Sequence, residues 1–228
     1  MLPRARRADG LLAIFFRVHS ASTLLSAGLL ACVHSNPVRL APDVDYGEKA
    51  GRVWVRGPWE AITPSSDIDE VIDQLCPAVE RLEGSRDGDD GTEYCGLLYS
   101  LPDGMFYASV PSPLGLLSHA QRGRHKSCRI PLMVRDDRAP PRIACDFHSH
   151  PWPDAPFSDG DLSTQKQKWS IRIQFDTTCR VYKYVPHLGE DRPGEVFLRV
   201  GKTWRLESIV RTGDKPYGKP TPALGEVR

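Results

Sequence analysis

The chain has 228 residues with 40% hydrophobic side chains, and its 30 Lys and Arg residues nearly balance 29 Asp and Glu residues. This length and composition predict one ordinary globular domain with appended segments, and neither an internal repeat nor a heptad pattern is visible. A formal net charge of +1 gives no electrostatic footprint for nucleic acid, so we set nucleic-acid binding aside.

The amino terminus has the pattern of an export signal. Arginines lie among the first seven positions, an apolar run follows at 11–16, and an uncharged stretch, SASTLLSAGLLAC, ends at Cys32. Because Arg17 interrupts the apolar residues, no run of about 18 residues exists that would predict a spanning helix. A basic start, a short apolar core and small residues before a break instead predict that residues 1–31 are a cleaved signal.

The four residues Leu29-Leu30-Ala31-Cys32 resemble the lipobox of bacterial lipoproteins. The resemblance implies that Cys32 is lipidated after cleavage, which would anchor the mature protein to a membrane of the cell envelope. The alternative is a buried amphipathic helix that ends in a cysteine, and in that case the protein stays in the cytoplasm.

Five cysteines remain if Cys32 carries the lipid: Cys76, Cys95, Cys128, Cys145 and Cys179. Outside the cytosol some of them could form disulfides, and an odd number leaves at least one free thiol. The lack of any C-x-x-C spacing disfavours a zinc site built from cysteines. We interpret Cys95, two residues from Glu93, as a small buried core thiol.

The first predicted elements are a strand and a helix. Residues 32–64 read as a linker and a first short strand, RVWVRG. A serine at 65 or 66 stands where a helix N-cap is expected, and apolar residues follow at helical spacing. The pattern predicts an amphipathic helix over 66–83, kinked at Pro77.

A hairpin and an insertion come next. The segments TEYCGLLYS and MFYASV flank LPDG, which predicts a hairpin. Residues 111–142 lack periodicity and are rich in proline and basic residues, so they predict a long insertion. Its basic part, 122–142, is interpreted as a solvated surface in preference to a site for an acidic substrate.

The remaining segments complete a mixed pattern. RIACDFHSH is predicted to be a strand, SDGDLSTQKQKW a short helix, and four further segments are predicted to be strands: IRIQF, CRVYKYV, EVFLRV and TWRLESIV. Residues 212–228 are predicted to be a disordered tail. Helices and strands mix without regular alternation, which predicts the α+β class.

The segment DFHSHPWPDAPFSDGD, residues 146–161, contains a candidate metal site. Side chains alternate faces along a strand, so His148 and His150 point the same way. Asp161 follows at the start of the predicted short helix and could supply a third ligand. Two histidines and a carboxylate leave a fourth position for water, as in catalytic zinc sites. The alternative for Ser158 and Asp161 is a role in capping that helix.

The series His148-Ser149-His150-Pro151, six residues, Ser158, two residues and Asp161 resembles the motif of the JAMM zinc metalloproteases. This MPN-plus or JAB-domain family, which includes deubiquitinating isopeptidases, also requires an upstream glutamate on a strand followed by a run like Cys-Gly-Leu-Leu. Glu93 in EYCGLLY fits that place. The resemblance covers residues 65–211 and implies a JAB/MPN-like mixed β-sheet flanked by helices, a cytidine-deaminase-like architecture.

The resemblance also implies a role for each motif residue. Zn²⁺ on His148, His150 and Asp161 would lower the pKa of a bound water and polarise the scissile carbonyl. Glu93 would be the general base that takes the water's proton and later delivers it to the leaving amine. Ser158 would donate a hydrogen bond to the oxyanion. Without the other four residues, Glu93 would read as an exposed strand carboxylate.

Three functions remain open at this point. The first is an exported, membrane-anchored zinc peptidase or isopeptidase that acts on a protein or peptide substrate. The second is a cytosolic JAMM peptidase that processes ubiquitin-like proteins, and the third is a non-catalytic binding module of the MPN type. Such modules typically lack metal-site residues, and none is missing here, so an enzyme is favoured. The sequence does not distinguish a peptide bond, an isopeptide bond and a cell-wall cross-link as the target.

Overall fold

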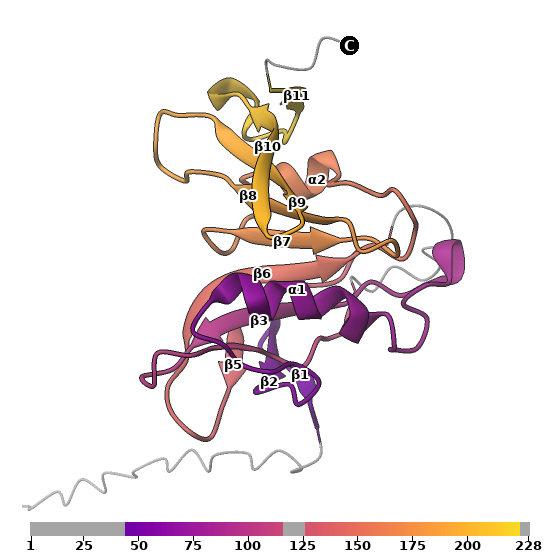
Figure 1. Cartoon of the computed structure of the whole chain (residues 1–228), viewed down its shortest axis with the longest axis vertical. Helices are drawn as coiled ribbons and strands as arrows, with labels where there is room; N and C mark the ends of the chain where they lie inside the picture. The colour runs from indigo at the N-terminus through magenta and orange to yellow at the C-terminus, as the bar shows by residue number, and fades with distance from the viewer. Residues whose placement is uncertain (1–43, 116–125, 224–228) are drawn as a thin grey trace, which may run out of the picture. The chain divides into compact units, whose positions relative to one another are not determined.

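The computed structural model describes residues 44–115 and 126–223, and strands dominate this part of the chain (Figure 1). A small sheet has the strand order β1-β2-β5, formed by β1 (Tyr46–Lys49), β2 (Arg52–Arg56) and β5 (Met133–Arg135). A large sheet has the order β11-β10-β9-β8-β7-β6-β3-β4. Its strands are β3 (Cys95–Ser100), β4 (Phe106–Ala108), β6 (Arg142–Ser149), β7 (Arg172–Phe175), β8 (Val181–Val185), β9 (Gly194–Val200), β10 (Thr203–Val210) and β11 (Pro220–Pro222).

The helix content shows that the expected α+β class is wrong. Alongside the eleven strands, the described residues contain two α-helices, α1 (Ile68–Val79) and α2 (Asp159–Leu162), and two single 3-10 turns. The described part of the protein is therefore mostly β, without the helix-flanked JAB/MPN-like sheet and cytidine-deaminase-like architecture that we expected. The predicted helix SDGDLSTQKQKW stops after four residues because no apolar side chain occurs between Leu162 and Trp169 to hold a second turn against the core.

The helix α1 covers one face of the large sheet. It begins after Asp67, whose side chain accepts a hydrogen bond of 2.9 Å from the backbone amide of Asp69, and Pro77 lies in its last turn. Its buried apolar side chains share one core cluster with residues of β3, β6 and β7, and Figure 1 shows α1 lying across β3 and β6. The helix expected over 66–83 is confirmed, although it is shorter at both ends.

Strand β6 carries the candidate ligands into the middle of the large sheet. It runs antiparallel to β3, with His148 opposite Cys95, and parallel to β7, with His148 opposite Gln174. The ring of Phe147 packs directly on Gly96 of β3, where a Cβ atom would lie 2.2 Å from that ring. The strand predicted from RIACDFHSH is confirmed.

Two disulfides connect distant parts of the described chain. Cys76 of α1 is bonded to Cys179 in the turn between β7 and β8, and Cys95 of β3 is bonded to Cys128. Cys145 is a buried free thiol. The expectation that some cysteines pair and that one stays free is confirmed, but the interpretation of Cys95 as a free core thiol is wrong.

Two segments expected to be irregular join the sheets instead. Part of the predicted insertion at 111–142 forms β5, which pairs with β2 in the small sheet. Residues 220–222 of the predicted disordered tail form β11, which pairs with β10. The tail is held because the backbone oxygen of Pro216 accepts a hydrogen bond of 2.6 Å from Ser163 Oγ.

The predicted export signal at 1–31 and the lipidation residue Cys32 lie outside the described residues. Within the described ranges, none of the helices has the length and apolar character needed to cross a membrane.

Candidate metal centre

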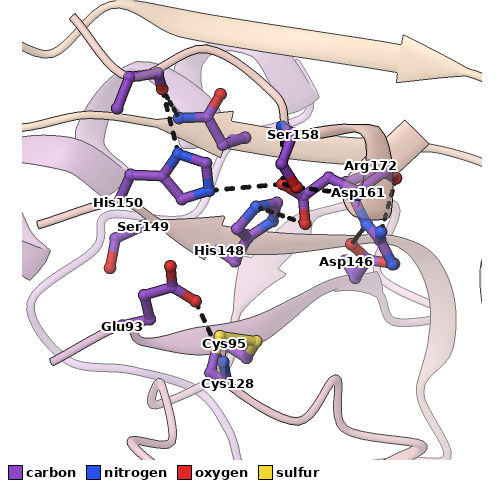
Figure 2. A network of polar contacts seen from close by, with 12 residues as sticks. Glu93, Cys95, Cys128, Asp146, His148, Ser149, His150, Ser158, Asp161 and Arg172 are labelled. Atoms are coloured by element: carbon purple, nitrogen blue, oxygen red, sulfur yellow. Dashed lines mark hydrogen bonds and ion pairs between the residues drawn. A yellow bond between two sulfur atoms is a disulfide. The ribbon is translucent and has the colours of Figure 1, made fainter. Parts of the chain in front are cut away.

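The end of β6 and the start of α2 bring three potential metal ligands together (Figure 2). His148 and His150 lie on the same face of β6, with ring centroids 5.0 Å apart. Asp161 faces both rings: its Oδ1 atom lies 3.5 Å from His148 Nε2, and its Oδ2 atom lies 3.5 Å from His150 Nε2. One ligand atom from each residue lies within 4.8 Å of the other two. These groups could therefore hold a metal ion.

His148 gives the strongest structural indication that the site takes a ligand. Its side chain is 3% exposed, and neither ring nitrogen has a hydrogen-bond partner. Burial lowers the pKa of His148, despite the opposing effect of Asp161, so its imidazole is neutral at physiological pH. A buried imidazole without partners is costly unless something occupies its lone pair. A metal ion held with His150 and Asp161 satisfies that requirement, and the residues therefore fit a metal.

His150 is oriented by a backbone carbonyl. Its Nδ1 atom lies 3.1 Å from the oxygen of Ala155, which leaves Nε2 directed towards Asp161. The same oxygen accepts a hydrogen bond of 2.7 Å from Gln174 Nε2. Burial opposes protonation of His150, but its contact with the Asp161 carboxylate prevails and raises its pKa. Such an arrangement fixes the tautomer that a metal needs.

Asp161 caps α2 and also faces the two histidines, so the two roles that the sequence left open are compatible. Ser158 is the N-cap of α2: its Oγ accepts from the Asp161 amide at 3.2 Å, while Asp161 Oδ2 accepts from the Ser158 amide at 2.9 Å. Ser158 Oγ also donates to Asp161 Oδ2 at 2.6 Å. Burial alone would raise the pKa of Asp161, but His148 and His150 hold it well below the usual range. Capping therefore holds the carboxylate in position, and the Ser158 hydroxyl lies beside it.

A buried ion pair beneath α2 was not identified from the sequence. Arg172 Nε donates to Asp146 Oδ1 at 2.8 Å, and the two residues are 3% and 0% exposed. Arg172 Nη1 also donates to the backbone oxygen of Asp161 at 2.8 Å. Asp146 lies two residues before His148 and therefore on the same face of the strand. A charged residue at that position of an apolar strand was the feature of the sequence that could have indicated the pair.

Glu93 lies just before β3 and not within it, which corrects the strand placement that we expected. Ser149 and Tyr94 continue the pairing of β3 with β6 through hydrogen bonds of 3.0 Å, so Glu93 lies beside His150. The side chain of Glu93 is buried, and its Oε2 atom accepts a hydrogen bond of 3.2 Å from the Cys128 amide. It is therefore not an exposed strand carboxylate.

The environment of Glu93 suits proton transfer near neutral pH. Burial, opposed by the charge of His150, raises the pKa of Glu93 from 4.5 to about 7. A general base works best when its pKa lies near the working pH, because it is then both available and basic enough. A cleft of about 1050 Å³ opens onto Glu93, the three potential ligands and Ser158. The structure thus brings all five sequence-predicted residues to one cavity.

A second group of potential ligands has a different character. Cys76, Glu80 and Cys179 lie close enough together to hold an ion. The two sulfur atoms are bonded to each other, so they offer no thiolate in this structure. We do not interpret this group as a metal site.

Comparisons of the chain with protein-family models, with curated proteins and with solved structures find no match. Support for a function therefore comes from the geometry of the site.

Proposed function

We propose that the protein is a zinc-dependent hydrolase that cleaves peptide or isopeptide amide bonds with water. The observation that carries this proposal is the convergence of His148, His150 and Asp161 at 3.5 Å contacts around an unsatisfied buried imidazole, with Glu93 beside them. Two ligand atoms that are each about 2.0–2.1 Å from a tetrahedral zinc ion are about 3.4 Å apart, which agrees with the observed spacing. The resemblance to the JAMM motif supports the same chemistry.

Each site residue has a separate role in the proposed reaction. Zinc bound by the three ligands would supply a Lewis acid that lowers the pKa of water and polarises the scissile carbonyl. The carboxylate of Glu93 removes a proton from the attacking water and returns it to the leaving amine. The Ser158 hydroxyl turns from Asp161 to donate a hydrogen bond to the developing oxyanion. The Arg172–Asp146 pair keeps Asp161 in place through its backbone oxygen.

An exported location is part of the proposal. Disulfides persist in oxidising compartments and are rare in the cytosol, so the Cys76–Cys179 and Cys95–Cys128 bonds favour the export signal over the cytosolic alternative. The lipobox-like residues before Cys32 would then anchor the mature protein to a membrane. Labelling with a radioactive fatty acid should mark the wild-type protein and not Cys32→Ser. An unlabelled, soluble and full-length wild-type protein would favour the cytosolic enzyme.

The metal is tested by elemental analysis after dialysis. Wild-type protein should retain about one zinc ion per chain, whereas His148→Ala and Asp161→Asn should lose most of it. Asp159→Asn is the matched control, because Asp159 lies in the same helix and lines the cleft but does not belong to the group of potential ligands. Unchanged zinc in both ligand variants would contradict the assignment.

If the zinc-loaded wild-type protein cleaves no substrate in a panel of peptide, isopeptide and cell-wall amides, the non-catalytic binding module becomes the better interpretation.

A further inference from the structure

The cleft contains lysine side chains to which the proposed chemistry gives no role. Beyond the metal ligands, it is lined by Arg129, Arg172 and three lysines: Lys126, Lys166 and Lys168. Arg172 is neutralised by Asp146, and Arg129 is neutralised by Glu48, which it contacts at 2.5 Å. Within the described ranges, none of the three lysines forms an ion pair or a side-chain hydrogen bond. Their charges are therefore available to a ligand.

Two of these lysines flank the centre. Lys166 Nζ lies 3.1 Å from the point where a Cβ atom on Gly160 would be, and Ser158 Oγ lies 3.5 Å from the same point. Lys126 precedes Cys128, whose amide donates to Glu93, and its charge acts on that carboxylate. Figure 2 shows Glu93 and Cys128 on one side of the two histidines and Ser158 on the other. One ammonium group is thus near the base and the other is near the N-cap of α2.

The acidic residues of the cleft do not cancel these charges. Asp154 is paired with Arg180 at 3.2 Å. Outside the metal centre, Asp159 is then the one acidic lining residue that has no ion pair among the described residues. Residues 116–125, which precede Lys126, contain no Asp or Glu. A divalent ion on the ligands would add further positive charge. A cleft of one sign with low-dielectric walls attracts ligands of the opposite sign.

The lining of the cleft also includes apolar side chains. Ile130 and Leu132 line it, and Leu132 is 37% exposed, whereas the lining residue Val53 is only 2% exposed. Binding sites commonly combine an apolar wall with a few placed charges that fix the orientation of the ligand. The lining therefore suits a polypeptide that presents a hydrophobic side chain and a carboxylate, and it suits a strongly hydrated polyanion less well.

Resting on the proposed function, we propose that the enzyme selects substrates with a carboxylate next to the scissile amide, which the charges of Lys126 and Lys166 on either side of the centre attract while an adjacent apolar side chain contacts Ile130 and Leu132. The carboxylate belongs to an acidic residue, or to the chain terminus, of a peptide. Since exposed ion pairs are individually weak, each lysine is expected to improve recognition by up to about five-fold. Salt should weaken the preference because it screens exposed charges.

A binding experiment tests this selection separately from catalysis. Zinc-loaded Glu93→Gln protein is titrated with matched fluorescent peptides that carry Glu or Gln at one position beside a central amide, and the affinities are compared by anisotropy. The Glu peptide should bind more tightly, and Lys126→Gln and Lys166→Gln should each reduce that preference. Lys202→Gln, which changes an exposed lysine in the turn between β9 and β10, should leave it unchanged.

The outcomes distinguish the two proposals. In one outcome, the Lys126→Gln and Lys166→Gln variants both reduce the carboxylate preference while the zinc-loaded wild-type protein hydrolyses no substrate. That result would support the selective cleft and contradict the hydrolase. Hydrolysis of Glu and Gln substrates with equal kcat/KM, together with equal binding, would overturn the selection and leave the hydrolase standing. A preference that persists in the double variant Lys126→Gln/Lys166→Gln would also overturn it.

Discussion

The two halves of the large sheet differ in what they bury. The half formed by β3, β6 and β7, with the residues beside these strands, buries titratable groups such as Glu93, Asp146, His148 and Arg172. The half formed by β8, β9 and β10 buries apolar and aromatic side chains such as Tyr184 and Val196, and no charged residue is buried in these three strands. Burying charges costs stability unless they are paired, so the first half resembles a functional site and the second a supporting scaffold.

The largest difference between the halves is expected in catalysis. Glu93→Gln should reduce hydrolysis by about 10²–10⁴-fold, because an amide cannot accept the proton. It should retain zinc, since Glu93 is not one of the three ligands. The measurement is kcat with the zinc content determined on the same sample. A Glu93→Gln protein that cleaves at the wild-type rate would remove this residue from the mechanism.

Breaking the buried ion pair should affect both stability and metal binding. Arg172→Met leaves Asp146 without its partner in the interior, which should cost about 3–5 kcal/mol of unfolding free energy. It also removes the hydrogen bond to the Asp161 backbone oxygen, so zinc should bind more weakly in the protein that remains folded. Denaturant unfolding and a zinc titration measure the two effects. The double variant Asp146→Leu/Arg172→Met should recover stability without recovering zinc affinity; recovery of both would show that the pair does not position Asp161.

The contribution of Glu93 to the stability of the metal-free protein should fall as the pH rises. The folded state raises the pKa of Glu93 from 4.5 to about 7, so it binds this proton more tightly than the unfolded chain does. Stability from this group is complete below about pH 4.5 and declines until about pH 7, by on the order of 3 kcal/mol. Chelator-treated Glu93→Gln should therefore exceed wild type in unfolding free energy at pH 8 and approach it at pH 4.5. Parallel pH profiles for the two proteins would contradict the burial of an ionisable Glu93.

The smallest effect is expected in the scaffold half. Val196→Ala in β9 removes two buried carbon atoms and should cost about 2 kcal/mol of unfolding free energy. Zinc content and kcat of the folded protein should not change, since none of the five site residues belongs to the apolar cluster that contains Val196. A clear fall in the kcat of the folded Val196→Ala protein would show that the division of the sheet into a site and a scaffold is wrong.

Local patterns predicted the elements that carry the ligands. Alternation along RIACDFHSH gave β6, and the spacing of His148, His150 and Asp161 anticipated their approach in the structure. The prediction of the fold class was wrong because a good N-cap starts α2 at Ser158 but cannot extend the helix without apolar residues. Long-range partners were also missed. The pairing of β11 with β10 and the Cys95–Cys128 bond depend on chain topology, which a linear pattern does not contain.

The two disulfides also divide the backbone into nested covalent rings. The bond between Cys76 and Cys179 closes a ring that contains Glu93, both histidines, Ser158 and Asp161, and the bond between Cys95 and Cys128 closes a smaller ring inside it. A single cut of the backbone at any peptide bond within the outer ring therefore leaves one covalent molecule. Such a nicked protein would migrate as an intact chain in a gel without reductant and as two fragments after reduction.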